Sequence, residues 1–288
     1  MKFAIFTVGA PELTPQEVLV KLKEYGYDGV EWRVTDPSDA APDAPADFWE
    51  NNRCTIDVNT VVEQAPAIKA MCEEAGVEIA ALGTYTRCNE YDKAENALKA
   101  AAAMGCKKIR ISPYMYDGSQ NYNELFQKAR EDYKVLEGLA KKYGVKVNLE
   151  MHMNTISASA SAARRLVDGL DPNYIGVVYD VGNMVYEGYE KYQAGLEILG
   201  DYLDHVHIKS AAWVQKDALA DGSAQWEVQA MPLNKGSVDF RTFLKVLKKS
   251  GYDGYVSFED FSKEKTTLEK LKFNIGYIRE IMEELKDE

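Results

Sequence analysis

The stretch AKKYGVKVNLEMHM at residues 140–153 decides the fold, because it joins the end of a helix to a short strand. The segment before Gly144 is rich in Lys and Ala, and glycine tolerates the left-handed conformation that closes a helix. A strand of about five residues follows, ending near Glu150. The stretch therefore predicts one helix–strand unit of an α/β protein.

The same order of helix, glycine or turn residue, and short strand recurs along the chain. Together with the opening strand FAIFTVG it gives eight strands, most of them nearly continuous in apolar residues, as parallel strands buried on both faces are. Eight such units, with no G-x-G-x-x-G after the first strand, favour a closed (β/α)8 TIM barrel over an open doubly wound sheet. We expect one domain over residues 1–288. The remaining units lie at 21–34, 73–86, 102–115, 170–183, 199–210 and 247–261, and a last helix lies at 267–285.

Composition narrows the class of protein. A chain of 288 residues suits one α/β barrel, and a hydrophobic fraction of 46% with 28% charged residues is typical of globular proteins. The net charge of −12 argues against nucleic acid or an anionic membrane as the main partner. The four cysteines form no C-x-x-C pair, and no segment has the run of about 20 apolar residues that a membrane span needs. These features predict a cytoplasmic protein.

Two long segments interrupt the repeat. Residues 35–58, rich in Pro, Asp and Ala, follow the second strand, and residues 211–239 follow the seventh. Both leave the carboxyl ends of predicted strands, where barrel active sites are built. Because they carry three of the four tryptophans, we expect loops that cover a substrate, with solvated insertions as the alternative.

The three histidines of the chain all lie near the carboxyl ends of predicted strands. Residues two apart on a strand point to the same side, so His152 shares a face with Glu150, and His205 shares one with His207. His205 is deeper than His207, which favours a supporting role beneath His207 or simple packing in the core.

Carboxylates end the neighbouring strands in the same way. Asp180 follows a buried strand in VVYDVGN, and Glu259 ends the eighth strand in YVSFEDF. A lone carboxylate or histidine at such a position is usually a cap, an ion-pair partner or a core residue. Four on consecutive strand ends instead predict one divalent metal site made by Glu150, Asp180, His207 and Glu259. The mixed O and N ligands suit Mn²⁺ first, then Mg²⁺, Co²⁺ or Zn²⁺.

The sequence resembles the xylose isomerase-like TIM barrel superfamily, the sugar phosphate isomerase/epimerase group, over essentially the whole chain. The motifs are GYDGVEWR at 26–33, NLEMH at 148–152, VVYDVGN at 177–183, HVHIK at 205–209 and the run from 236 to 259 that ends in GYDGYVSFE. The resemblance places metal ligands on the same four residues. Two features depart from the family pattern: Asn183 stands where many relatives have His, and Ser210 and Asn234-Lys235 replace common loop residues.

The resemblance also implies a reaction. The metal would hold a carbonyl and an adjacent hydroxyl of the substrate. The carbon beside the carbonyl would then lose a proton to give a stabilised enediolate, with Glu150 and Glu259 as the acid/base pair. We therefore expect an isomerase or epimerase of a keto-sugar or related polyol. The alternative is a dehydratase or lyase acting on an inosose or an oxidised 3-keto glycoside, such as the metal-bound subunit of a C-glycoside-cleaving enzyme. An apurinic-site endonuclease would need a cluster of several zinc ions, and therefore more than three histidines. A non-catalytic sugar-binding barrel would not need all four metal ligands, which are present here.

Several further residues are candidates for contact with a small carbohydrate substrate. His152 faces the expected cavity and is a candidate to hold a hydroxyl, to act as a base, or only to pack. Of Trp32 and Arg33 only one faces the barrel interior, since they are adjacent on a strand. Whether the protein forms homo-oligomers or hetero-oligomers is left open. The full set of substrate-binding candidates is His152, Asn183, Lys209, Trp32, Arg33 and Trp49, with the 51–53 run, Arg87 and Arg110 as weaker polar contacts.

Overall fold

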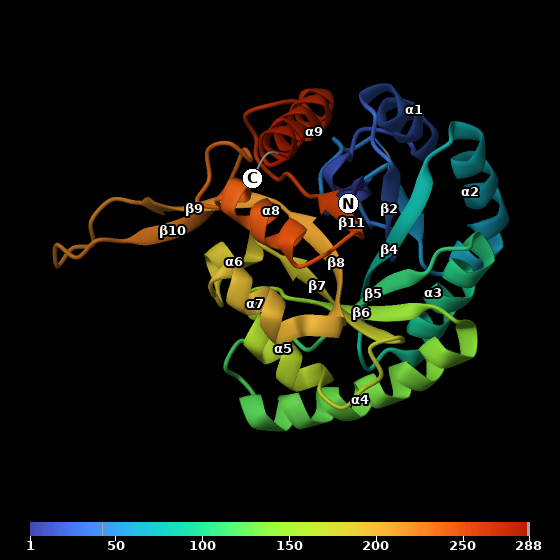
Figure 1. Ribbon diagram of the computed structural model, residues 1–288, viewed down its shortest axis with the longest axis horizontal. Coiled ribbons are helices and arrows are strands. Elements are labelled where there is room, and N and C mark those ends of the chain that lie inside the picture. The colour runs from blue at the N-terminus through green and yellow to red at the C-terminus, as the bar shows by residue number, and fades with distance from the viewer. Residues whose placement is uncertain (42, 287–288) are drawn as a thin grey trace.

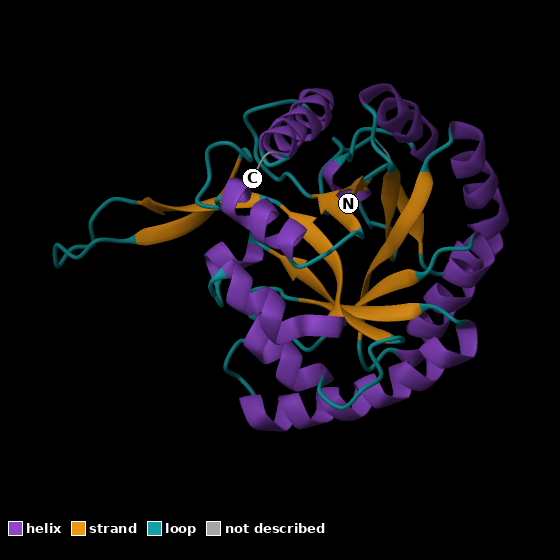
Figure 2. Cartoon of the chain, in the orientation of Figure 1, coloured by secondary structure: helices purple, strands orange, loops and turns teal. Residues whose placement is uncertain are grey.

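The computed structural model describes residues 1–41 and 43–286, so position 42 of the first long loop and residues 287–288 lie outside the described residues. Eight parallel strands form a closed barrel inside a ring of helices (Figures 1 and 2). The ring closes because β1 pairs in parallel with both β2 and β11. The barrel strands are β1 (Lys2–Phe6), β2 (Gly29–Thr35), β4 (Glu78–Arg87), β5 (Lys108–Ser112), β6 (Lys146–Glu150), β7 (Ile175–Asp180), β8 (Leu203–Ile208) and β11 (Tyr255–Phe258).

The helices follow the strands in the expected alternation. Their apolar faces pack against the outside of the barrel, where most of the hydrophobic core lies. Two short 3-10 turns, Thr7–Gly9 and Gly200–Tyr202, complete the connections. The helices are α1 (Pro15–Tyr25), α2 (Val61–Ala75), α3 (Tyr91–Met104), α4 (Tyr122–Tyr143), α5 (Ala160–Val167), α6 (Asn183–Tyr186), α7 (Tyr192–Leu199), α8 (Phe240–Lys249) and α9 (Thr267–Glu284).

Helix α1 shows why these segments start and stop where they do. The side chain of Thr14 accepts a hydrogen bond from the backbone N–H of Glu17, and the Glu17 carboxylate accepts one from the backbone N–H of Thr14. Pro15 stands at the first helical position, where its missing N–H costs nothing. Gly26 then ends the helix with φ at 83°, in the left-handed region that disfavours other residues.

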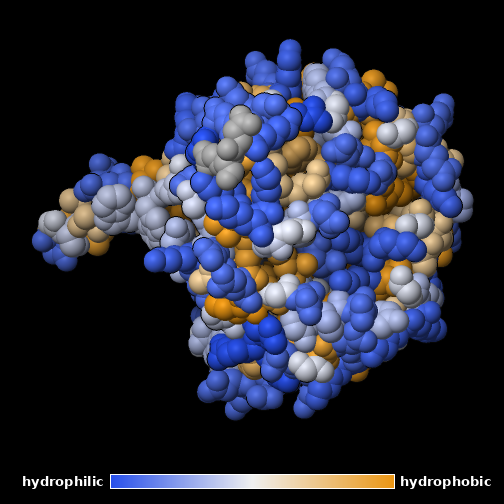
Figure 3. All heavy atoms as spheres, in the orientation of Figure 1, coloured by the Kyte–Doolittle hydropathy of each residue, from blue (hydrophilic) through white to orange (hydrophobic). Residues whose placement is uncertain are grey.

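The two long segments have different structures. The first runs from β2 into the short strand β3 (Thr55–Asp57), which pairs in parallel with the carboxyl end of β2. The chain then continues into α2. The second forms an antiparallel hairpin of β9 (Ser210–Gln215) and β10 (Trp226–Met231) that projects away from the barrel (Figures 1 and 3). The sequence predicted a loop that covers the substrate here, with a solvated insertion as the alternative. Only the base of the hairpin reaches the mouth of the barrel, through Ser210 and Ala230.

Within residues 1–41 and 43–286, the structure contains no helix of sufficient length and apolar character to span a bilayer. The four cysteines are all buried and unbonded to one another.

Candidate active site

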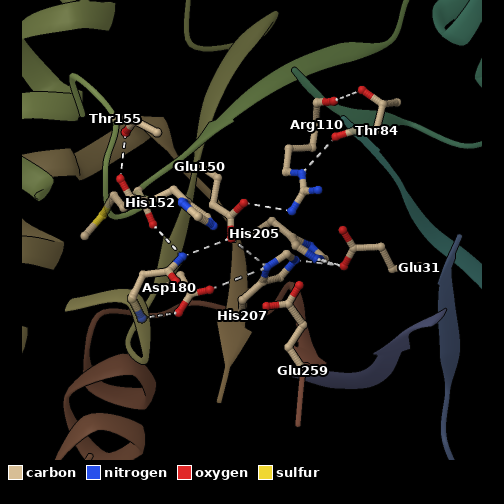
Figure 4. Close-up of polar contacts among 12 residues, drawn as sticks. Glu31, Thr84, Arg110, Glu150, His152, Thr155, Asp180, His205, His207 and Glu259 are labelled. Atoms are coloured by element: carbon tan, nitrogen blue, oxygen red, sulfur yellow. Dashed lines mark hydrogen bonds and ion pairs between the residues drawn. The ribbon is translucent and has the colours of Figure 1, made fainter. Parts of the chain in front are cut away.

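The four predicted ligands meet at the carboxyl end of the barrel. Glu150 and Asp180 are the last residues of β6 and β7, His207 lies near the end of β8, and Glu259 directly follows β11. Each offers one ligand atom, and these atoms all lie within 4.8 Å of one another. Figure 4 shows the side chains converging, and none of the four is more than 3% exposed. The parallel strands create this convergence, since they end at one rim.

Asp180 points one carboxylate oxygen toward the other three ligands, because its other oxygen already accepts hydrogen bonds from the backbone. Oδ1 accepts hydrogen bonds of 2.8 Å from the backbone N–H groups of Gly182 and Asn183. Oδ2 lies 3.8 Å from Nδ1 of His207. Burial raises the pKa of Asp180 to about 7; the Lys209 ammonium opposes the rise, and the carboxylates of Glu150 and Glu259 add to it.

Glu150 is held in the same way by a buried guanidinium. Nη1 of Arg110 lies 2.7 Å from Oε2 of Glu150, while Oε1 lies 3.2 Å from Nδ1 of His207. Arg110 is fixed in turn by a 3.1 Å hydrogen bond from Nε to the Thr84 carbonyl. Burial alone would raise the pKa of Glu150, but Arg110 and the neighbouring imidazoles hold it well below its usual range.

Lys209 places a second cation against the ligands. Its Nζ lies 2.8 Å from Oδ2 of Asp180 and also contacts the Glu259 carboxylate. Gly182 permits this approach, because a Cβ at that position would come within 2.2 Å of Cγ of Lys209. Burial opposes the charge on Lys209, but Asp180 and Glu259 outweigh it and keep its pKa above the usual range.

Glu31, which the sequence analysis did not select, lies on the far side of His207 (Figure 4). Its Oε2 is 2.9 Å from Nε2 of His207 and 3.0 Å from Nε2 of His205. Burial would raise the pKa of Glu31, but the two imidazoles lower it well below its usual value. In the metal-free protein, burial acts against protonation of His207, yet Glu31 and Glu150 outweigh it and raise the His207 pKa well above the usual value.

The donor set fits a divalent cation. Three carboxylates and one imidazole are the hard and borderline ligands that Mn²⁺, Mg²⁺, Co²⁺ and Zn²⁺ take. Oδ2 of Asp180 is fully buried and lies 2.8 Å from the Lys209 ammonium. The carboxylates of Glu150 and Glu259 also repel that of Asp180, and a divalent cation between them would relieve the repulsion. These residues can therefore hold a metal.

A cavity of about 520 Å³ reaches two of the four residues, Glu150 and Glu259. Glu150, Glu259, Lys209 and His152 line its polar side. Nδ1 of His152 lies 2.8 Å from the Met153 carbonyl, and burial lowers the pKa of His152, with Glu150 opposing. A neutral imidazole donating from Nδ1 leaves Nε2 as an acceptor. The other wall is aromatic and apolar, made by Phe48, Trp49, Tyr85, Pro113, Met115, Met153, Tyr186 and Phe261.

Trp49, predicted as a substrate contact, lines this cavity and is 52% exposed. Its ring centroid lies 5.1 Å from that of Phe261. Arg33 supports it from below: Nη2 of Arg33 donates to the Trp49 carbonyl at 2.9 Å, and Nη1 donates to Thr55. Arg33 thus holds the first long loop against the barrel, and it is outside the described lining of the cavity.

The structure places two more substrate-binding candidates away from the cavity. Trp32 is fully buried on the outer face of β2, beside Cys72 of α2, which gives it a packing role. Asn183 is also fully buried, and its Nδ2 donates to the Met151 carbonyl at 3.0 Å and to Oε1 of Glu150 at 3.3 Å. Asn183 therefore positions Glu150 from behind. These placements give no support to direct substrate contact by either residue.

A larger hollow, about 740 Å³, lies at the amino ends of the strands. Lys2 and Glu78 pair across it at 2.7 Å, and both are about half exposed. The four convergent ligands lie at the opposite end of the barrel, so we assign the chemistry to the smaller cavity.

Comparisons with known proteins agree with this architecture. The model of the family described as xylose isomerase-like TIM barrel matches residues 19–281. An inosose dehydratase from Clostridium perfringens is 26% identical over 227 residues, which cover 70% of this chain and 75% of that protein. A 3-keto-D-glucoside 4-epimerase from E. coli matches with a TM-score of 0.73 at 19% identity, covering 97% of this chain and 99% of that one.

A third protein shares the fold. A xylose isomerase-like TIM barrel protein from Mycobacterium smegmatis, solved in complex with magnesium, matches with a TM-score of 0.65 at 17% identity. The match covers 99% of this chain and 97% of that one. Because the family model spans nearly the whole barrel, we conclude that the chain belongs to the xylose isomerase-like TIM barrel family.

Proposed function

We propose that this protein is a divalent-metal-dependent isomerase or epimerase of a keto-sugar or related polyol. One observation carries the proposal: the ligand atoms of Glu150, Asp180, His207 and Glu259 lie within 4.8 Å of one another, and Glu150 and Glu259 line a cavity. The ligand types favour Mn²⁺, with Mg²⁺, Co²⁺ and Zn²⁺ as alternatives. When bound, the ion would stabilise negative charge that develops on a neighbouring carbonyl oxygen.

Glu150 and Glu259 are the proposed acid/base pair. They come from β6 and from the end of β11, with β7 and β8 between them, so they reach the cavity floor from two sides. One carboxylate can take a proton from the carbon beside a carbonyl, and the other can return a proton to the opposite face or to the adjacent carbon.

The two carboxylates differ in their cationic partners. Glu150 is paired with Arg110, whose guanidinium stays charged at ordinary pH. Glu259 contacts the ammonium of Lys209, whose pKa is held above its usual range, so this cation stays charged as well. Each carboxylate therefore has a fixed cation beside it, and either one can remove the proton while the other returns it.

A sugar-like substrate suits the cavity walls. Aromatic rings such as Trp49 and Phe261 offer flat apolar surface on which the C–H face of a sugar ring can pack, and Lys209 and His152 offer polar contacts to hydroxyl groups. The names of the relatives, an inosose dehydratase and a 3-keto-D-glucoside 4-epimerase, support the same substrate class.

The second candidate is a dehydratase or lyase with the same first step. Two observations favour it: several of the relatives are inosose dehydratases, and His152 adds a further proton carrier at the cavity wall. Expulsion of water or an aglycone needs a general acid near the leaving group, and His152 is placed for that task.

Incubation of keto-sugars, inososes and oxidised glycosides with Mn²⁺-loaded protein in D₂O tests the proposal and separates its two forms. Deuterium incorporation next to the carbonyl, without loss of water or aglycone, is expected for the isomerase or epimerase; loss of either identifies the lyase. Glu259→Gln should abolish exchange, whereas Glu63→Gln, on the exposed face of α2, should leave it unchanged. Absence of exchange with every carbonyl compound in the panel would contradict both forms.

A further inference from the structure

Glu31 forms a buried junction between two histidines. Its Oε2 lies 2.9 Å from Nε2 of His207 and 3.0 Å from Nε2 of His205, and the three residues are fully buried. Figure 4 shows Glu31 on the opposite side of His207 from Glu150 and Asp180. It therefore contacts the ligand cluster only through an imidazole.

The two nitrogens of His207 face different environments. Nδ1 lies 3.2 Å from Oε1 of Glu150 and 3.8 Å from Oδ2 of Asp180, so it faces the ligand centre. Nε2 faces Glu31. A histidine that binds a metal through one nitrogen keeps its proton on the other, and the acceptor of that proton fixes the ring orientation and the tautomer.

The barrel interior leaves room for Glu31 and restrains the ring it holds. A Cβ at Gly83 would lie 3.0 Å from Oε1 of Glu31 and 2.4 Å from Cε2 of Phe6, so glycine on β4 makes space for both. The Phe6 ring stacks on His207 with 5.7 Å between centroids. Stacking limits tilt of the imidazole, but it does not choose between the ring's two flipped orientations. The acceptor at Glu31 makes that choice.

We propose that Glu31 is a positioning residue that accepts the Nε2–H of His207 and thereby commits Nδ1 to the metal. The inference rests on the proposed metal site and goes beyond it, since Glu31 itself is no ligand of that site. His205 contributes a second hydrogen bond, which holds the Glu31 carboxylate in place beneath His207.

Titration of metal-free protein with Mn²⁺ or Co²⁺, followed by calorimetry or the Co²⁺ absorption band, tests the role without any substrate. Glu31→Leu removes the acceptor and should weaken binding about 100-fold, and Glu31→Gln, which keeps the shape but not the charge, about 10-fold. Binding within about threefold of wild type in Glu31→Leu would overturn the inference.

Two further variants separate this inference from the metal site itself. His207→Asn removes the ligand and should abolish tight binding; His205→Asn breaks the other hydrogen bond to Glu31 and should change affinity less than about threefold. If His205→Asn weakens binding as much as Glu31→Leu, general damage to the barrel centre explains the loss and the inference fails. If the wild type binds no divalent ion, the metal site fails and takes the inference with it.

A measurement on the unaltered chain covers the case in which Glu31→Leu does not fold. The chain has only three histidines, so imidazole ¹⁵N NMR of the Zn²⁺-loaded protein yields three ring systems, assignable with His152→Asn and His205→Asn. We expect His207 to bind through Nδ1 and to carry a slowly exchanging proton on Nε2. A proton on Nδ1 of the bound ring would overturn the proposal.

Discussion

Nη1 of Arg110 lies 2.7 Å from Oε2 of Glu150, with only 5% and 4% of the two side chains exposed. The guanidinium also lies over the rings of Phe6 and Tyr85, at 5.0 and 4.8 Å from their centroids. Arg110 thus neutralises one carboxylate of the centre through Oε2, while Oε1 faces His207 and Asn183. Because a guanidinium does not titrate in this range, this compensation holds across the working pH.

Removal of Arg110 should lower the stability of the folded protein. Arg110→Met leaves Glu150 as a buried charge without its partner, and breaking such a pair costs about 3–5 kcal/mol in the free energy of unfolding. Arg110→Lys keeps the charge and should lose less. Urea unfolding of the metal-free protein checks this expectation, and a cost below about 1 kcal/mol for Arg110→Met would contradict the structural role of the pair.

Metal affinity should fall as the solution becomes acidic. The pKa of Asp180 is about 7 in the metal-free protein, chiefly because of burial, so the bound proton must leave before Oδ2 can ligate an ion. The His207 pKa is also raised, so metal binding releases a proton there too. Affinity should drop about tenfold or more per pH unit below about pH 7. Calorimetry in buffers of different ionisation enthalpy measures the protons released; equal affinity at pH 6 and pH 8 would contradict the assignment.

His152 should affect turnover without affecting metal binding. It lines the cavity, but it is outside the set of convergent ligands. If Nε2 carries a proton during the reaction, His152→Asn should lower kcat by about 100-fold or more on whichever substrate exchanges deuterium, with metal affinity within about threefold of wild type. An unchanged kcat with a raised KM would show that His152 only contacts the substrate. No change in either constant would show that His152 only packs against its neighbours.

A pair of lysines at the other end of the barrel should govern acid stability. The Asp204 carboxylate lies 2.9 Å from Nζ of Lys108 and 3.0 Å from Nζ of Lys146, and it accepts a 2.7 Å hydrogen bond from Asn148. Burial would raise the pKa of Asp204, but the lysines lower it well below its usual value. A lowered pKa in the folded state gives stability that is complete above the unfolded value, about 3.9, and is lost as the pH falls below it.

Asp204→Asn should therefore destabilise the protein by about 1.5–3 kcal/mol at pH 7. The difference from wild type should shrink as the pH is lowered through about 4 towards the folded-state pKa. Unfolding free energies measured from pH 2 to pH 7 check the trend. A difference that is independent of pH would show that lost packing, and not the carboxylate charge, is responsible.

The strand-end ligands were predictable from the sequence, because the end of a strand and the alternation of side chains between its two faces are both local properties. Glu150 and Asp180 end short buried strands, and the two-residue spacing in HVHIK puts His207 on the inward face. The helix stops were equally local, as Gly144 shows. The geometry of parallel strands then brings these positions to one rim.

The supporting residues were not predictable in the same way. Glu31 and Arg33 are two apart on β2 and so share one side of it, but this spacing does not say how deep in the barrel each side chain reaches or what it contacts there. Arg33 meets Thr55 and the Trp49 carbonyl, which depend on the path of the first long loop. Glu31 meets two histidines from β8, more than 170 positions away. Such contacts form only when the barrel closes and brings distant strands together, so a short stretch of sequence does not predict them.

The hairpin of β9 and β10 was missed for a related reason. Its two strands are separated by a long polar turn, and β9 (SAAWVQ) does not alternate between apolar and polar residues, although β10 (WEVQAM) begins with such an alternation. Trp213 and Trp226, expected over the substrate, are instead 52% and 51% exposed on the projecting hairpin.

The claim on which the account depends is that one divalent ion binds between Glu150, Asp180, His207 and Glu259. Anomalous scattering from a crystal of the protein grown with Mn²⁺ tests this most directly. We expect one strong peak per chain, about 2.0–2.3 Å from a carboxylate oxygen of each acid and from Nδ1 of His207. The absence of a peak at that position, or a peak held by other residues, would contradict it.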